Sequence, residues 1–139
     1  FENASSYLEW DGQTLTEPEF LTELHRATGC GILLDINNVY VSSRNHGWDA
    51  NAYIRAIPTA AITQYHLAGH SDHGTHLIDT HDAPVTDNVW RLFQYTLQTH
   101  GPRSTMIEWD ENIPEFAVLE AELTKAKTIA AQAHEKTAA

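Results

Sequence analysis

The sequence is poor in several residues on which whole classes of protein depend. It has one cysteine, Cys30, in 139 residues, which excludes an internal disulfide and any cysteine-based zinc site. Only 8 lysines and arginines stand against 19 aspartates and glutamates, and the net charge is −11. That balance argues against a nucleic-acid backbone or an anionic membrane as the main partner. No apolar run approaches the length of a membrane-spanning helix, so we expect neither a nucleic acid nor a membrane as partner.

The residues that are present are typical of one folded domain. Hydrophobic residues make up 42% of the chain and charged residues 19%, as in globular proteins. A length of 139 residues is about that of a single domain. The chain starts at Phe1 without an initiator methionine or a signal peptide, and we therefore expect it to come from inside a longer protein.

Histidine is abundant and clustered. Five of the nine histidines fall between His66 and His81, and several acidic residues stand at the ends of apolar runs. An acidic chain with clustered imidazoles has the ligands that divalent metals need. The alternative, which composition alone favours, is an acidic surface with a histidine-rich loop.

Short apolar runs alternate with segments of helical period. The runs predict strands at residues 1–3, 31–37, 62–67, 76–80 and 104–108. The helical segments begin near Thr16, Asp49, Pro84 and Pro114, and the first of them opens with a capping box and stops at Gly29. We expect one partial domain over residues 1–129, followed by a frayed tail over residues 130–139.

Alternation of this kind predicts βαβ units and a parallel sheet, hence an α/β fold. The two candidates are a (β/α)8 TIM barrel and an open doubly wound sheet. No glycine-rich phosphate loop follows a strand, so the dinucleotide-binding version of the open sheet lacks its fingerprint. About four strand–helix pairs make half a barrel. We therefore predict the C-terminal half of a TIM barrel, completed by a missing N-terminal half or by a second copy.

Every predicted strand ends in a side chain that can bind a metal. These are Glu2, then Asp35 with Asn38, then His66, then Asp79 with His81, and finally Glu108. Catalytic residues of TIM barrels lie at the carboxyl ends of the strands, where the loops converge. Several carboxylates buried together require a cation to neutralise them. Five such strand ends in succession favour a metal site over five unrelated turns or helix caps.

Four further residues are candidates for contacts with substrate or for support of the ligands: Asn37, His70, Trp109 and Asp110. Each has an ordinary alternative. Asn37 and Asn38 are a common turn pair, His70 lies on a histidine-rich loop that solvent can cover, and Trp109 can simply pack. No Ser-His-Asp triad, P-loop or zinc-protease motif is present.

Five motifs in this order are similar to a known family. They are ENASSY at residues 2–7, LDINNVY at 34–40, HLAGH at 66–70, IDTHD at 78–82 and IEWD at 107–110. Together they resemble the MbnB-like family of multinuclear non-heme iron-dependent oxidases, which has a xylose-isomerase-like TIM barrel and was formerly uncharacterised. The resemblance extends from Glu2 to about Val118.

The resemblance implies a cluster of two or three iron ions in a cytoplasmic bacterial enzyme. Its ligands in this chain would be Glu2, Asp35, Asn38, His66, Asp79, His81 and Glu108. Family members activate O2 and oxidise cysteine-containing residues of ribosomally made peptides, and a partner protein commonly presents the peptide. Imidazole and carboxylate ligands with open positions suit iron(II) and O2.

Two features separate this chain from the family and its wider superfamily. Further histidine ligands of the family come from barrel strands that this chain does not contain. Asn38 stands where the trinuclear-zinc endonucleases of abasic-site repair place a histidine. The alternatives are another divalent-metal barrel enzyme with zinc or manganese, such as a sugar isomerase or an endonuclease, and an inactive half-barrel fragment.

Overall fold

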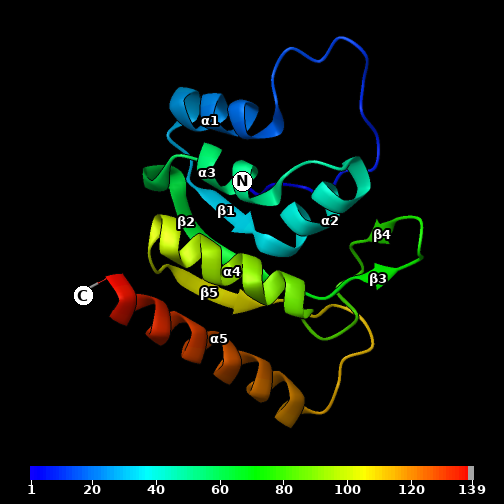
Figure 1. Cartoon of the computed structure of the whole chain (residues 1–139), viewed down its shortest axis with the longest axis vertical. Coiled ribbons are helices and arrows are strands. Elements are labelled where there is room, and N and C mark those ends of the chain that lie inside the picture. The colour runs from blue at the N-terminus through cyan, green and yellow to red at the C-terminus, as the bar shows by residue number, and fades with distance from the viewer. Residues whose placement is uncertain (138–139) are drawn as a thin grey trace.

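The computed structural model describes the backbone of residues 1–137 and the side chains of residues 1–133. Three parallel strands form its main sheet, in the order β1 (Ile32–Asp35), β2 (Ile62–Leu67) and β5 (Ser104–Ile107). Glu2 adds a parallel bridge to Leu33, beside β1. Helices alternate with these strands along the chain (Figure 1). The predicted α/β half barrel is therefore confirmed.

In the described part of the chain, five α-helices accompany the sheet: α1 (Glu17–Thr28), α2 (Ile36–His46), α3 (Ala50–Ala56), α4 (Asp87–His100) and α5 (Phe116–Thr137). A short 3-10 turn, η1 (Thr59–Ala61), leads into β2. The helices fan along the sheet, with α1 and α5 at opposite ends (Figure 1). Among the residues that the structure describes, no helix combines the length and the apolar character that crossing a bilayer requires.

The signals that delimit α1 act as the sequence predicts. The Thr16 side chain accepts a hydrogen bond from the Glu19 backbone, and the Glu19 side chain accepts one from the Thr16 backbone, which completes the capping box. Gly29 ends the helix in the left-handed conformation, at φ 71°.

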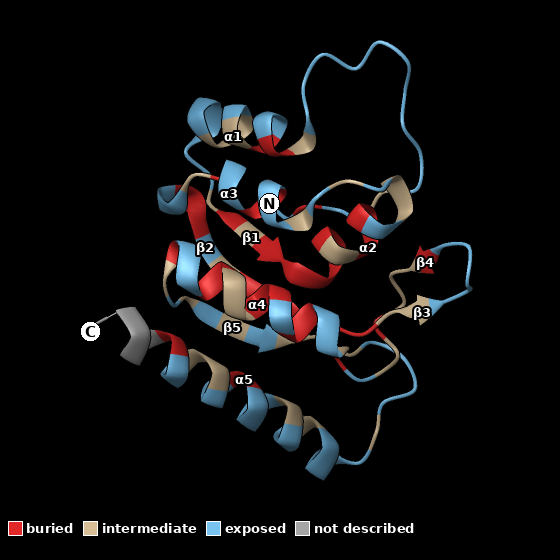
Figure 2. Ribbon diagram, viewed as in Figure 1, coloured by how far each residue is buried: buried red, intermediate tan, exposed pale blue. Residues whose placement is uncertain are grey.

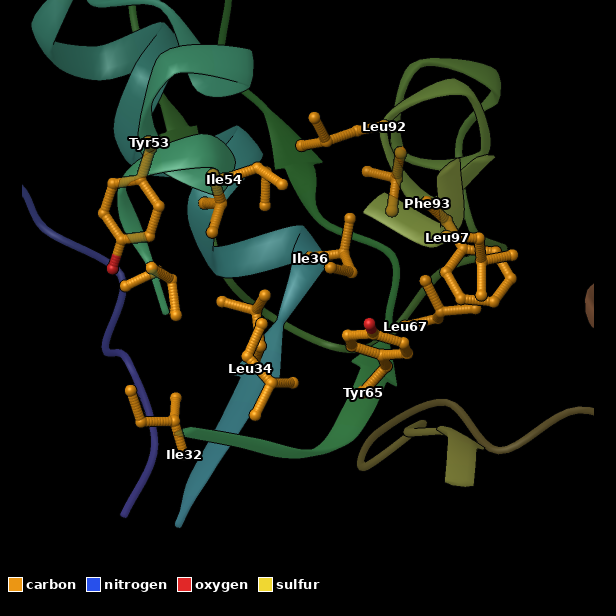
Figure 3. Packing of buried hydrophobic residues seen from close by; sticks show 14 of the residues in the cluster. Ile32, Leu34, Ile36, Tyr53, Ile54, Tyr65, Leu67, Leu92, Phe93 and Leu97 are labelled. Carbon is orange, nitrogen blue, oxygen red and sulfur yellow. The ribbon is translucent and has the colours of Figure 1, made fainter. Parts of the chain in front are cut away.

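The hydrophobic core lies between the sheet and the helices. Tyr65 and Phe93 are fully buried there and pack edge to face, with ring centroids 6.1 Å apart (Figure 3). Side chains alternate along a strand, so Tyr65 and Leu67 enter this core while Gln64 and His66 share the other face. Figure 2 shows the buried residues concentrated in β1, β2, α2 and α4, whereas α5 is largely exposed.

Three details differ from the sequence-based expectations. The run at residues 31–37 ends as a strand at Asp35, because the Asp35 carboxylate caps α2, which starts at Ile36. Residues 76–80 form no barrel strand: Leu77–Ile78 is β4, paired antiparallel with β3 (Ser71–Asp72). Helix α5 continues to Thr137, since the expected tail is rich in good helix formers and Ala133 is buried. Residues 138 and 139 lie outside the described part.

Candidate metal centre

Four acidic and imidazole side chains meet where the parallel strands end. Asp35 is the last residue of β1 and stands beside His66 of β2 in the register of the sheet. Glu108 follows β5, and its backbone N–H donates to the Leu67 carbonyl at 2.9 Å. With Glu2, these residues can offer one ligand atom each, all within 4.8 Å of one another. They come from four neighbouring parallel segments, which explains why residues over 100 positions apart converge.

His66 is held at the centre of this group. Its Nδ1 lies 3.0 Å from the Glu108 carboxylate and 3.9 Å from that of Glu2. On the other side of the ring, Nε2 lies 3.1 Å from the Gln64 side-chain nitrogen. The imidazole is buried between two acids, so its ring orientation is fixed toward the cluster.

A second group adjoins the first and shares Glu108 with it. His81, Glu108 and Asp110 can also offer ligand atoms within 4.8 Å of one another. His81 Nδ1 lies 3.4 Å from both the Glu108 and the Asp110 carboxylates, and its Nε2 lies 2.7 Å from Asp79 Oδ1. One carboxylate common to two ligand groups is the arrangement that a bridging ligand between two ions needs.

The backbone at His81 is held in an uncommon conformation. Its φ is +49°, which lies in the left-handed region that residues other than glycine seldom adopt. The His81 carbonyl accepts a hydrogen bond from the Asp110 N–H at 2.8 Å. This bond ties the loop after β4 to the loop after β5 and turns the imidazole toward Glu108. Strained backbone of this kind is concentrated at functional sites.

Two buried oxygen atoms in the cluster have no hydrogen-bond partner. Asp35 Oδ1 accepts from the Asn38 N–H at 2.7 Å, but Asp35 Oδ2 is unpaired. The Asn38 side-chain nitrogen donates to the Asn3 carbonyl at 3.0 Å, and its oxygen, Oδ1, is likewise unpaired. An unpaired buried acceptor costs free energy unless a donor or a cation satisfies it.

The pKa values follow from this crowding. Burial raises the pKa of Asp35 to about 8 and outweighs the opposing hydrogen bond from Asn38. Burial also raises the pKa of Glu2. Burial lowers the pKa of His81, but the hydrogen bond and charge of Asp79 outweigh it and bring the pKa to about 9. A divalent cation would reverse the penalty on the carboxylates.

A second layer of side chains supports the cluster. Asn37 is fully buried, and its amide nitrogen donates to Asp79 Oδ1 at 2.6 Å. Its amide oxygen lies 2.7 Å from His70 Nδ1, and burial lowers the pKa of His70. Asn37, in the first turn of α2, therefore connects this helix to the loops that follow β2 and β4. The buried Trp109 indole nitrogen has no hydrogen-bond partner.

Asn3 is a structural contributor that the sequence gives little reason to single out. Its side-chain nitrogen donates to the Asp35 carbonyl at 3.0 Å, and its side-chain oxygen accepts from the Asp35 N–H at 2.8 Å. This pair of bonds replaces the strand ladder next to Asp35. The one sequence signal was its place in the predicted strand at residues 1–3, within the ENASSY motif.

All the candidate ligands lie at this end of the sheet: Glu2, Asp35, Asn38, His66, Asp79, His81 and Glu108. The donors are imidazole nitrogens and carboxylate or amide oxygens, without thiolate. Such a set suits iron, zinc and manganese. The two unpaired oxygens and the shared Glu108 fit a metal cluster, so the residues present are compatible with the group that the family resemblance implies.

A parallel α/β sheet whose carboxyl-end loops gather acids and imidazoles defines the class of TIM-barrel proteins with a candidate metal centre. Within that class, the chain belongs to the family of RiPP precursor modification enzymes MbnB/TglH/ChrH, whose family model matches residues 1–131. RiPP denotes a ribosomally synthesised and post-translationally modified peptide.

Relatives in several bacteria carry the name UPF0276 protein. A protein of Chromobacterium violaceum is 48% identical over 136 residues, which cover 98% of this chain and 49% of the relative. One of Rhizorhabdus wittichii is 51% identical over 138 residues, covering 99% of this chain and 49% of the relative. One of Bordetella parapertussis is 51% identical over 126 residues, covering 87% and 44%. The chain thus spans about half the length of these relatives.

Proposed function

We propose that this chain forms part of an iron-dependent oxidase that uses O2 to modify cysteine-containing residues of a ribosomally made peptide. The cluster carries this proposal, because its two ligand groups share Glu108 and leave two buried oxygens unpaired. Membership of a family of RiPP precursor modification enzymes supports it. Bound iron would supply the redox chemistry that O2 requires, which no side chain of this cluster provides by itself.

The chain's own residues would contribute ligands and geometry. Glu2, Asp35, His66 and Glu108 would hold one ion, and His81, Glu108 and Asp110 a second. Asn38 Oδ1 is unpaired and lies beside Asp35, so it is available to the first ion. Asp79 would keep His81 directed at the site through its contact with Nε2.

Substrate and partner follow from the same proposal. Cysteine thiolate is a soft ligand that complements a set made only of nitrogen and oxygen donors. The substrate would therefore be a peptide whose cysteine reaches the cluster, presented by a partner protein. Residues of the part of the relatives that this chain does not span would complete both the ligand set and the substrate cavity.

Peptide oxidation tests the proposal directly. Full-length protein, reduced and loaded with iron(II) without oxygen, is mixed with air-saturated buffer and candidate cysteine-containing precursor peptides encoded beside its gene. We expect O2 uptake and a peptide mass change that both require iron, and both should be lost in His66→Ala. Peptide turnover with zinc or manganese in place of iron would overturn the proposal. So would the absence of turnover with iron, together with a metal content that His66→Ala leaves unchanged.

A further inference from the structure

A hollow in the surface lies away from the metal cluster. It has a volume of about 1140 Å³. It lies between the loop at residues 4–13, the start of α1 and the corner between α2 and α3. None of the candidate metal ligands is among the described residues that line it. The exposed loop passes beside α2, to which Ser6 is hydrogen-bonded through Ser42, and arches over to the start of α1 (Figure 2). We call this hollow the α1–α3 groove.

Aromatic side chains form much of the wall of the groove. They are Tyr7, Trp10, Phe20, Trp48 and Tyr53. Trp48 and Tyr53 stack with ring centroids 5.3 Å apart and planes inclined by 10°. Trp10 is 74% exposed and Phe20 54% exposed. Large aromatic surfaces left in water at the rim of a hollow indicate a site that a partner covers.

Three acidic side chains and one imidazole, that of His46, line the groove. Glu9, Glu17 and Asp49 line it, and no lysine or arginine does so among its described lining residues. Asp49 already pairs with Arg55 at 3.5 Å and Glu9 with His46 at 3.6 Å. Glu17 has no basic partner within ion-pair distance in the described part of the chain. Its carboxylate faces the Ala4 backbone N–H, the Tyr53 hydroxyl and, at longer range, His46, but no lysine or arginine balances its charge.

Tyr53 places a buried hydroxyl beside Glu17. Its side chain is only 5% exposed, and its hydroxyl makes no hydrogen bond of good geometry. In Figure 3 this hydroxyl points out of the core, toward the N-terminal segment. Burial raises the pKa of Tyr53, and the adjacent Glu17 carboxylate raises it further. Burial likewise raises the pKa of Glu17 itself. A cation at this point would relieve both effects.

We propose that the α1–α3 groove binds a segment of peptide in which a lysine or arginine adjoins an apolar side chain. The basic group would pair with Glu17 and the Tyr53 hydroxyl, and the aromatic rings would receive the apolar neighbour and the methylene stem. The volume exceeds what a single amino acid fills. The inference rests on the proposed function only in taking a peptide as the ligand, and it assigns the groove to a segment distant from the cysteine that is oxidised.

Binding to metal-free full-length protein tests this separately from catalysis. Fluorescence anisotropy would follow a labelled peptide of alternating leucine and lysine. Matched peptides would carry glutamate or norleucine in place of lysine. We expect saturable binding of the lysine peptide, and affinity about tenfold weaker for the norleucine peptide, as for loss of a charge-assisted hydrogen bond. The glutamate peptide should not bind.

Variants locate the binding. Glu17→Gln and Tyr53→Phe should each weaken the lysine peptide severalfold, and Trp10→Ala should do so through the aromatic wall. Glu23→Gln removes the same charge from α1 outside the groove and should leave the affinity unchanged. Circular dichroism confirms that each variant is folded before it is scored. Spermidine, added as a competitor of the labelled lysine peptide, distinguishes a peptide site from a polyamine site. At a peptide site it should displace the peptide only weakly.

Three results would overturn the inference. They are equal binding of the lysine and glutamate peptides, an affinity unaffected by Glu17→Gln in folded protein, and displacement by spermidine at the concentration of the peptide itself. None of them depends on iron, so the oxidase proposal would stand or fall on its own experiment.

Discussion

At the scale of single residues, Glu108 is the side chain on which the candidate centre depends most. Its carboxylate lies within ion-pair distance of both His66 and His81, and it belongs to both ligand groups. Asp110 belongs to one group only and its side chain is 63% exposed. The two acids are separated by one position in the sequence, yet their expected contributions differ.

Glu108→Gln should therefore lower metal content more than Asp110→Asn does. Losing the shared carboxylate affects both ions, and we expect metal affinity to fall by about 100-fold or more, against about tenfold for Asp110→Asn. Equilibrium dialysis followed by elemental analysis measures both. Equal losses in the two variants would show that Glu108 is not shared.

The raised pKa values predict how metal-free protein responds to pH. The Asp35 pKa rises from its ordinary 3.8 to about 8, and that of His81 from 6.5 to about 9. Folded protein then binds more protons than unfolded protein in these windows, so stability falls as pH rises. The Asp35 contribution is complete below pH 3.8 and lost toward pH 8; that of His81 is complete below pH 6.5 and lost through pH 9.

Urea unfolding of metal-free protein between pH 6 and pH 9 should show a midpoint that declines steadily. Asp35→Asn should flatten the decline, since the amide has no charge to bury. Added divalent metal should raise the midpoint most at the alkaline end, where the carboxylates are ionised. A midpoint that increases with pH in the metal-free protein would contradict these assignments.

At the scale of elements, the site depends on how closely two loops cross. Gly69, in the loop after β2, lies so near the loop after β4 that a Cβ there would meet the Ala83 carbonyl oxygen at 2.0 Å. Asn37 Nδ2 also approaches the Gly69 carbonyl, at 3.4 Å. The crossing thus sets the position of Asp79 and His81 relative to His66.

Gly69→Ala should push these loops apart. We expect a loss of about 2–4 kcal/mol in unfolding free energy, because rigid backbone faces the new methyl group, and a weaker metal site. Gly74→Ala is the control: it has positive φ but nothing within 4 Å, so it should cost about 1 kcal/mol and leave metal affinity intact. Urea unfolding and metal titration of both variants check this; an unaltered metal affinity in Gly69→Ala would refute the role of the crossing.

The elements show what a sequence can and cannot specify. The capping box at Thr16 and the apolar runs of β1, β2 and β5 are local signals, and the structure has those elements. The sequence analysis does not predict α2 (Ile36–His46), because Asp35 both ends a strand and caps this helix. The prediction of a barrel strand at residues 76–80 is wrong, because these residues belong to the β3–β4 hairpin. Two adjacent apolar residues are too few to show whether a strand belongs to a hairpin or to a barrel.

The sequence predicts the candidate metal ligands better than the side chains that hold those ligands in place. Strand-end position alone gathered the candidate ligands, since parallel strands place their carboxyl ends at one edge. Asn3 was not predicted, because its role is to bond backbone 32 residues away. Asn37 was named only as a candidate for substrate contact or support; its bond to Asp79 spans 42 positions. Such contacts exist only once the loops have folded over one another.

At the scale of the whole molecule, core and candidate centre lie on different sides of the sheet. Phe93 packs on Tyr65 among the helices, whereas His66 turns to the opposite face with the acids. The sheet also ends in β5, whose side chains are alternately exposed and half-buried, as at Met106. With relatives about twice as long, this exposed strand is where we expect further barrel strands.

Stability and metal binding should consequently be separable. Phe93→Leu should lower the unfolding free energy by about 1–2 kcal/mol through incomplete filling of the core. Metal content per folded chain should not change, because Phe93 faces away from the ligands. Urea unfolding and metal titration of the variant check this. If Phe93→Leu lost metal at a temperature at which it is still folded, the core and the metal ligands would not act independently.

We expect the side chains at the carboxyl ends of these strands to hold iron. The most direct test is the metal content of full-length protein purified without oxygen, with Mössbauer spectroscopy to count the iron environments, alongside Glu108→Gln. We expect at least two irons per chain in distinct environments, and loss of both in the variant. Zinc or manganese in place of iron, or an iron content that Glu108→Gln leaves unchanged, would contradict it.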